Sequence, residues 1–99
     1  MPIGELSVKV TVKYFATLRK ITGKEEEKIA LRGTSTVKKL VDILSKKYGD
    51  RFSNYVDRQE KGDYLLFLVN GRNISVFRGF ETKLKEGDSF VIMPALGGG

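Results

Sequence analysis

The 99-residue chain contains no cysteine and no histidine. It therefore has no disulfide bond and no thiol nucleophile, and it lacks the usual ligands of zinc, copper and haem. Histidine is also the usual general base near neutral pH, so catalysis would have to rest on carboxylates, lysine, tyrosine or serine. No constellation of these residues stands out. The composition argues against a self-sufficient enzyme and predicts no metal site.

Long hydrophobic runs are also absent. No apolar run approaches the roughly 20 residues of a membrane span. The first residues show no basic region followed by an apolar stretch, so no secretory signal is visible and a cytoplasmic location is the default expectation. The length suits one domain with a modest core. We expect that domain over residues 1–96, with residues 97–99 as a flexible tail.

Positive charge predominates, with a net charge of +6. Such a balance is compatible with nucleic acid, an anionic membrane or an acidic protein partner. The basic residues are mixed with acidic ones and form no dense block. An RNA-binding domain would need aromatic and basic side chains together on an open sheet face. Only Lys9, Lys13 and Phe15 hint at that arrangement, so nucleic acid is an unfavoured partner.

The first part of the chain predicts a β-hairpin. Apolar and polar residues alternate over 6–14, which is typical of a half-buried strand. A turn or short helical piece follows over 16–22, and residues 25–31 are expected to form a second strand. Three adjacent glutamates begin that strand, and on a strand they point to both faces. Because this geometry suits metal chelation poorly, we interpret them as a solvated edge.

From residue 37 the hydrophobic period becomes helical. Residues 33–36 supply N-cap candidates, and Gly49 is placed to end the helix. The apolar residues of one face are Val37, Leu40, Val41, Leu44 and Tyr48. Lysines occupy the opposite face, where ordinary solvation is favoured over contact with a nucleic acid.

The second half predicts a loop and further strands. Residues 50–63 are polar and are expected to form a long loop that can hold one helical turn around Phe52 to Val56. The apolar run 64–69 suits a strand buried in the middle of a sheet. Residues 73–76 suggest a short strand, and 89–94 the last strand. This order favours an α+β fold, a ubiquitin-like β-grasp roll in which one main helix packs across a mixed sheet.

Three glycines, Gly97-Gly98-Gly99, directly follow the apolar run 90–96. Glycine has no Cβ and weak backbone preferences, so such a stretch holds no regular structure. When extended, it can reach about 10 Å from the domain. We expect it to enter a narrow slot in another protein and to present the α-carboxylate of Gly99 there. The alternative interpretation is a frayed end or a cloning scar.

Several short motifs together resemble a known family. They are Tyr14-Phe15-Ala16-Thr17-Leu18-Arg19 before Gly23, Thr36-Val37 with Leu40, Val69-Asn70-Gly71, and Leu84 with Glu86-Gly87-Asp88 and Ile92-Met93-Pro94. In this order and spacing, the chain resembles the MoaD-like small subunit of molybdopterin synthase, a sulfur carrier of the ubiquitin-like β-grasp kind. It departs from that family in having Ala95 after Pro94, where a second proline is common, and in ending with a third glycine.

The resemblance implies that Gly99, preceded by Gly98, is the reactive end. A MoeB-like adenylating enzyme of the ubiquitin-activating type would use ATP and Mg to form an acyl-adenylate. A sulfur donor would convert this to a thiocarboxylate, which would enter the MoaE-like large subunit of molybdopterin synthase. There it would donate sulfur to the pterin whose dithiolene holds molybdenum or tungsten. The chain itself would bind no cofactor and have no activity alone.

A partner is expected to dock on an exposed apolar patch near the tail. In the last strand, period two turns Phe90 and Ile92 toward the helix and Val91 and Met93 outward. The predicted partner-binding residues are Ile74, Met93, Leu96 and Gly97. The alternative is that Ile74 and Met93 belong to the rim of the core.

Two related functions remain open. ThiS-like sulfur carriers for thiazole synthesis share the fold and the Gly-Gly end but are usually shorter. A ubiquitin-like modifier would instead join Gly99 to a protein lysine through an isopeptide bond. The 50–63 segment and the proline before the glycines favour the molybdopterin branch.

Overall fold

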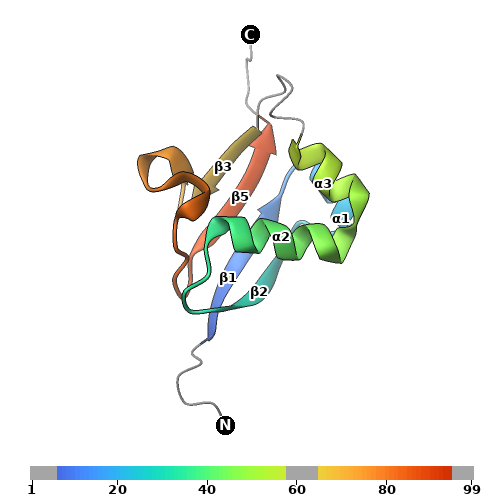
Figure 1. Ribbon diagram of the computed structural model, residues 1–99. Helices are drawn as coiled ribbons and strands as arrows, with labels where there is room; N and C mark the ends of the chain where they lie inside the picture. The colour runs from blue at the N-terminus through green and yellow to red at the C-terminus, as the bar shows by residue number, and fades with distance from the viewer. Residues whose placement is uncertain (1–6, 58–64, 95–99) are drawn as a thin grey trace.

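One mixed five-stranded sheet organises the computed structural model, which describes residues 7–57 and 65–94 (Figure 1). The strands are β1 (Ser7–Tyr14), β2 (Glu26–Arg32), β3 (Leu65–Val69), β4 (Arg72–Asn73) and β5 (Ser89–Pro94). Their order across the sheet is β2-β1-β5-β3-β4. β1 and β5 run parallel, whereas all other neighbours are antiparallel. The last strand therefore lies at the centre of the sheet.

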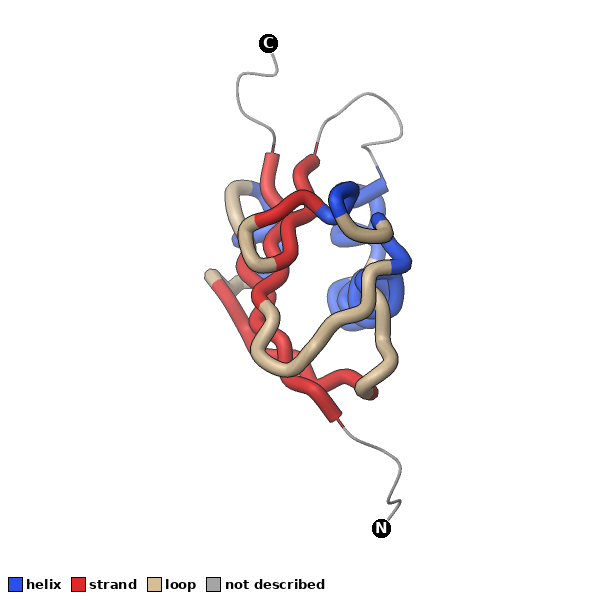
Figure 2. The backbone as a smooth tube through the Cα atoms, turned by 90° about the vertical axis from the view of Figure 1, so that its left-hand side faces the viewer, coloured by secondary structure: helices blue, strands red, loops and turns tan. Residues whose placement is uncertain are grey.

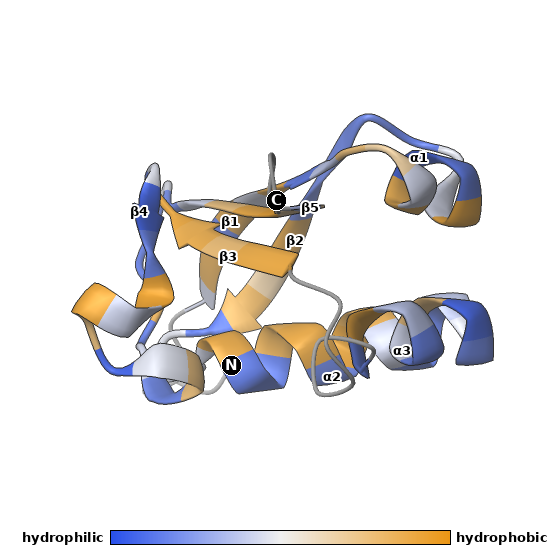
Figure 3. Cartoon of the chain, turned by 90° about the horizontal axis from the view of Figure 1, so that it is seen from above, coloured by the Kyte–Doolittle hydropathy of each residue, from blue (hydrophilic) through white to orange (hydrophobic). Residues whose placement is uncertain are grey.

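The helices lie mainly on one face of this sheet (Figures 1 and 2). They are α1 (Thr17–Thr22), α2 (Val37–Tyr48), α3 (Asp50–Asp57) and the 3-10 helices η2 (Ile74–Val76) and η3 (Gly79–Glu81). Figure 3 shows α2 lying across the sheet with its apolar side toward the strands. No helix in the described ranges is long and apolar enough to cross a membrane.

The bounds of α2 follow from its caps. The Thr36 hydroxyl accepts the Lys39 backbone N–H at 3.2 Å, which satisfies one of the free donors of the first turn. Gly49 ends the helix with a φ of 82°, a conformation that costs glycine little. Leu40 and Leu44 are completely buried against the sheet. The predicted helix, its caps and the α+β β-grasp roll are confirmed.

Three predicted segments differ from the structure. Residues 50–57 form a full helix, α3, where only one helical turn within a loop was expected, because Phe52 and Val56 lie one turn apart and are both buried. Residues 58–63 of the same predicted loop lie outside the described residues. The predicted strand 73–76 is β4 followed by η2, since the Asn73 side chain accepts the Ser75 N–H at 2.9 Å and turns the chain into a 3-10 helix.

The prediction that the run 64–69 forms a strand in the middle of the sheet is confirmed for residues 65–69, but the expected burial of both faces of that strand is wrong. β3 does lie inside the sheet, between β5 and β4. However, only Phe67 and Val69 are buried, whereas Leu66 and Leu68 on the opposite face are half-buried. The longer helices α2 and α3 lie on the other face of the sheet, so the outer face of β3 keeps contact with solvent (Figure 3).

Candidate functional site

The start of β5 is fixed by a hydrogen-bonded turn that involves two of the sequence motifs. Asn70, at φ 51°, donates from its side-chain amide to the Asp88 carboxylate at 2.9 Å. Its amide oxygen accepts the Ser89 N–H at 2.9 Å, and its backbone N–H donates to the Ser89 carbonyl at 2.8 Å. The other Asp88 oxygen accepts the Lys85 N–H at 2.8 Å. The Val-Asn-Gly and Glu-Gly-Asp motifs thus hold the entry to β5 in place.

The end of β5 is held between two strands. Tyr14, the last residue of β1, is in register with Ile92, and Leu65, the first of β3, is in register with Pro94. Phe90 and Ile92 are completely buried under the helices. The chain therefore leaves the centre of the sheet between two neighbouring strands. The predicted site residues Leu96, Gly97, Gly98 and Gly99 follow this point and lie outside the described residues.

Four half-buried apolar side chains lie on the sheet face away from the helices; we call them the outer-face patch. Its members are Leu66, Leu68, Val91 and Met93. Across β3 and β5, Leu66 is in register with Met93, and Leu68 with Val91. Exposed Lys13 borders the patch because it is in register with Val91 from the β1 side. The outward placement of Val91 and Met93 agrees with the predicted alternation of β5.

The prediction that Ile74 lies on an exposed apolar patch is wrong. Its side chain is only 5% exposed and belongs to the hydrophobic core. The reason is local: the chain turns into η2 directly after Asn73, and this turn directs Ile74 inward instead of along the sheet edge. A partner can therefore contact Met93 on the outer-face patch, but Ile74 acts as an anchor of the fold.

A buried carboxylate from the predicted solvated edge joins the hairpin to α2. Glu27, the last glutamate of the three, has a side chain only 9% exposed. One of its oxygens accepts the Tyr14 hydroxyl at 2.5 Å and also the Tyr48 hydroxyl. The other oxygen accepts the Lys47 ammonium at 2.6 Å and the Lys24 ammonium at 3.5 Å. We call these five residues the Glu27 cluster, and they correct the solvated-edge interpretation at this position.

The Glu27 cluster is suited to stability rather than to proton transfer. Burial acts to raise the pKa of Glu27, but hydrogen bonds from Lys47, Tyr14 and Tyr48 outweigh it and lower the pKa from 4.5 to about 2. Burial, followed by the hydrogen bond to Glu27, raises the pKa of Tyr14 far above its usual value. Neither group changes its charge near neutral pH. Within the described ranges, no group of three or more acidic side chains could hold a metal ion.

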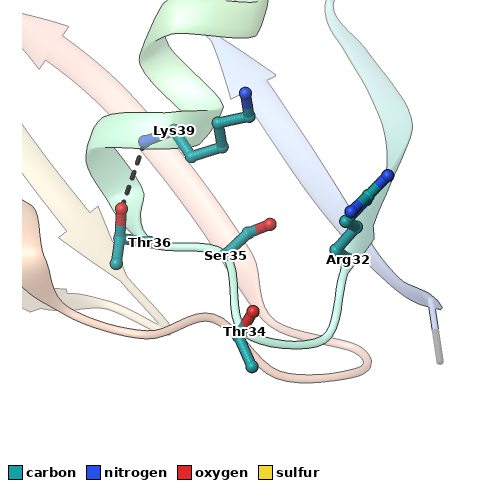
Figure 4. Close-up of a pocket in the computed structure, with 5 residues that line it drawn as sticks. All are labelled: Arg32, Thr34, Ser35, Thr36 and Lys39. Atoms are coloured by element: carbon teal, nitrogen blue, oxygen red, sulfur yellow. Dashed lines mark hydrogen bonds between the residues drawn. The ribbon is translucent and has the colours of Figure 1, made fainter. Parts of the chain in front are cut away.

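A cavity of about 480 Å³ opens beside the turn between β2 and α2 (Figure 4). Its lining residues are Arg32, Thr34, Ser35, Thr36 and Lys39. Arg32 is in register with Ser7 at the start of β1, whereas the chain leaves β5 beside Tyr14 at the end of β1. At about 3.3 Å per strand residue, some 23 Å of strand separates the two places. This cavity is therefore remote from the end of β5.

Comparison with known proteins places the chain in a family. The sequence profile of the ThiS family matches residues 12–99. The chain belongs to the ThiS family. The match begins within β1 and includes all of β5, the outer-face patch and the three glycines. The predicted ubiquitin-like β-grasp relationship is thereby confirmed for this ThiS-family protein.

Three relatives indicate the range of proteins that this ThiS-family chain resembles. A protein named as a sulfur carrier in Archaeoglobus fulgidus is 34% identical over 65 residues, which cover 65% of this chain and 74% of the relative. The solution structure of small archaeal modifier protein 1 from Methanosarcina acetivorans has 32% identity and a TM-score of 0.67, with 95% of this chain and 99% of that chain covered. A Pyrococcus furiosus structure described as subunit 1 of a molybdopterin converting factor has 27% identity and a TM-score of 0.67, with coverages of 90% and 99%.

Proposed function

We propose that this ThiS-family protein is a sulfur carrier that works through the α-carboxylate of Gly99. An adenylating enzyme of the ubiquitin-activating type joins that carboxylate to AMP, releasing pyrophosphate from ATP·Mg. Sulfide equivalent then attacks the acyl carbon, AMP leaves, and Gly99 ends in a thiocarboxylate. The carboxylate needs this activation because it is a poor electrophile until it carries a good leaving group.

The observation that carries the proposal is the position of the last strand. β5 lies at the centre of the sheet, and the glycines follow it within a few residues. A partner that binds the outer-face patch thereby holds the folded domain a few residues from the reacting Gly99. Holding the reactants in place supplies much of the rate in such two-protein reactions. The name of the Archaeoglobus fulgidus relative supports the same function.

The chemistry of the chain supports a role as cosubstrate. It has no histidine and no cysteine, and the buried ionisable groups of the Glu27 cluster are fixed in ion pairs and hydrogen bonds. Proton transfer, nucleotide binding and sulfur activation are therefore functions of its partners. We expect no catalytic activity from this protein alone.

We further propose that the recipient of the sulfur is the pterin of the molybdenum or tungsten cofactor. The chain would then act as the small subunit of molybdopterin synthase, with its tail inserted into a MoaE-like large subunit. The likeness to the Pyrococcus furiosus structure supports this assignment. The alternative recipient of sulfur from the same thiocarboxylate is a precursor in thiazole synthesis.

A second candidate function is protein modification. It is favoured by the likeness to small archaeal modifier protein 1, which extends over 95% of this chain at 32% identity. Here a lysine amine of a target protein would attack the acyl-adenylate, AMP would leave and an isopeptide bond would form. The first step is shared with the sulfur carrier, so the two functions diverge only in the nucleophile.

One experiment separates these proposals. The full chain is incubated with an adenylating enzyme from the same genome, ATP, Mg and sulfide, and its intact mass is measured. The carrier function predicts a gain equal to the difference between one sulfur and one oxygen atom, located at Gly99 by fragmentation. Transfer of that sulfur to a pterin precursor in the presence of a large subunit supports the molybdopterin role. Conjugates of raised mass in cells, lost when Gly99 is removed, would favour the modifier instead.

A chain extended by one alanine after Gly99 is the matched control. It keeps the fold and the outer-face patch but has no carboxylate at the required position. We expect it to bind the adenylating enzyme and to form no thiocarboxylate. Full conversion of this extended chain would contradict the proposed reacting group.

A further inference from the structure

Two apolar side chains beyond β4, at the edge of the sheet, are exposed to solvent. Val76 is 63% exposed and Phe77 is 44% exposed, and they are the large hydrophobic side chains of the described ranges that fall in the exposed class. They lie in and directly after η2, on the β4 side of the sheet, opposite the side that carries α1 and α3 (Figures 1 and 3). Adjacent exposed apolar residues of this kind often mark an interaction site.

The turn that presents them is anchored on both sides. Ile74 is buried before them, and after them the Phe80 ring packs edge-on against Phe67 with a centroid distance of 5.1 Å. The Phe77 N–H donates to the Ile74 carbonyl at 3.0 Å, and the Arg78 N–H donates to the Thr82 hydroxyl at 3.0 Å. The backbone is therefore ordered before any partner arrives, which lowers the entropy cost of binding.

The charges around this turn are mainly positive. Between residues 72 and 85 there are four basic side chains and one carboxylate. Arg72 and Arg78, both exposed, flank the apolar pair in sequence. With the whole chain at +6, a second copy of this protein would be repelled from this turn, whereas a surface rich in carboxylates would be attracted.

We propose that Arg72, Val76, Phe77 and Arg78 form a second docking surface, here named the η2 surface, for a protein whose apolar recess is rimmed by Asp and Glu side chains. Resting on the proposed function, the geometry points to the adenylating enzyme as that protein. During activation the end of the tail changes from carboxylate to acyl-adenylate to thiocarboxylate, so contacts at the tail change at every step. Contacts at the η2 surface stay constant and keep the carrier bound throughout.

The test compares two paired changes with a control. V76S/F77S removes the apolar part of the η2 surface, and R72E/R78E reverses its charge. K39E/K46E makes the same change in net charge on the exposed face of α2. The dissociation constant with the purified adenylating enzyme is measured by calorimetry at two salt concentrations, and circular dichroism verifies the fold of each variant.

We expect V76S/F77S and R72E/R78E each to raise the dissociation constant at least tenfold, with K39E/K46E changing it less than threefold. The dissociation constant of R72E/R78E should rise less with salt than that of wild type. Salt screens the attraction between the two arginines and the acidic rim, and this variant no longer makes that attraction. In ATP–pyrophosphate exchange, V76S/F77S should raise KM with kcat unchanged, as loss of uniform binding predicts.

Several outcomes would overturn the inference. An unchanged dissociation constant for V76S/F77S would refute the apolar contact at the η2 surface. Equal effects of R72E/R78E and K39E/K46E would refute the contact with an acidic rim. A wild-type dimer in sedimentation that V76S/F77S dissolves would assign the surface to a second copy. If wild type and V76S/F77S form the thiocarboxylate with equal KM, the η2 surface alone fails; if wild type forms none, the proposed function fails.

Discussion

Replacing Glu27 by glutamine tests the Glu27 cluster as a stabilising element. The pKa of Glu27 is lowered from 4.5 to about 2, and each pKa unit corresponds to about 1.4 kcal/mol, so its ionised form contributes up to about 3 kcal/mol. Glutamine keeps the size of the side chain but loses the charge that pairs with Lys47 at 2.6 Å. Its amide group also places a donor against the donors of the cluster. We therefore expect E27Q to lower the free energy of unfolding by about 2–3 kcal/mol at pH 7.

The pH dependence gives the sharper measurement. Because the folded-state pKa is depressed, the stabilisation from Glu27 is fully present above the unfolded value of 4.5 and is lost as the pH falls toward about 2. The difference between wild type and E27Q should therefore be constant from pH 8 to pH 5 and shrink steadily below pH 4.5. Urea unfolding followed by circular dichroism at each pH measures this difference.

The control is E26Q, which changes the neighbouring residue on the same strand. Its free energy of unfolding should stay within about 0.5 kcal/mol of wild type, as is usual for a surface position. The reasoning about the Glu27 cluster would be refuted by a difference for E27Q as small as that of E26Q at pH 7. It would equally be refuted by a difference that does not narrow in acid.

Three further predictions concern β5, the residues after it and the turn that holds its start. Removing Gly98 and Gly99 should abolish thiocarboxylate formation, as judged by intact mass, while the thermal midpoint stays within about 2 °C of the full chain; a larger drop would assign a structural role to these glycines. M93E should raise the dissociation constant for the large synthase subunit more than about tenfold with the fold unchanged, and unchanged affinity would place the docking surface away from the outer-face patch. N70A should lower the free energy of unfolding by about 2 kcal/mol, because it removes the bridge to Asp88 and places alanine at a positive φ. N70G, which tolerates that φ, should be less destabilised in the same urea titration, and equal losses would show that backbone strain contributes nothing.

The sequence predicted well those elements whose apolar residues follow a clear period, above all where residues that start or end the element flank it. For α2, the helical period of the apolar residues coincides with Thr36 at one end and Gly49 at the other, and the structure begins and ends the helix there. In β1 and β5 the side chains alternate, so the amino-acid pattern is enough to assign their inward and outward faces. The ubiquitin-like fold follows from the order of these elements.

Two short segments were predicted incompletely or wrongly because their structure depends on local hydrogen bonds or on few apolar residues. α3 has only eight residues, and its polar composition resembles that of a loop. The pair Phe52 and Val56, one turn apart, indicated a single helical turn, and the structure extends it to a full helix. At residues 73–76 the capping side chain of Asn73 directs the chain into η2, and this placed Ile74 in the core, against the prediction.

The Glu27 cluster needed tertiary information. Tyr14 and Tyr48 are 34 residues apart, and only the packing of α2 on the hairpin brings both hydroxyls to the same carboxylate. One signal was nevertheless present in the sequence. Glu27 has the same parity as Ile29 and Leu31, so strict alternation already turns it toward the core rather than toward solvent.

The parallel pairing of β1 and β5 also determines how the protein responds to mechanical force. The start of β1 and the end of β5 lie at opposite ends of this strand pair. Tension applied between residues 7 and 94 therefore acts along the strands, and the hydrogen bonds between them carry the load together in shear instead of opening one after another. A force applied to the glycine end acts on β5, which is hydrogen-bonded to β1 on one side and to β3 on the other. In a single-molecule trap, unfolding by pulling on residues 7 and 94 should accordingly require more force than pulling on β4. The hydrogen bonds between β4 and β3 can break one at a time.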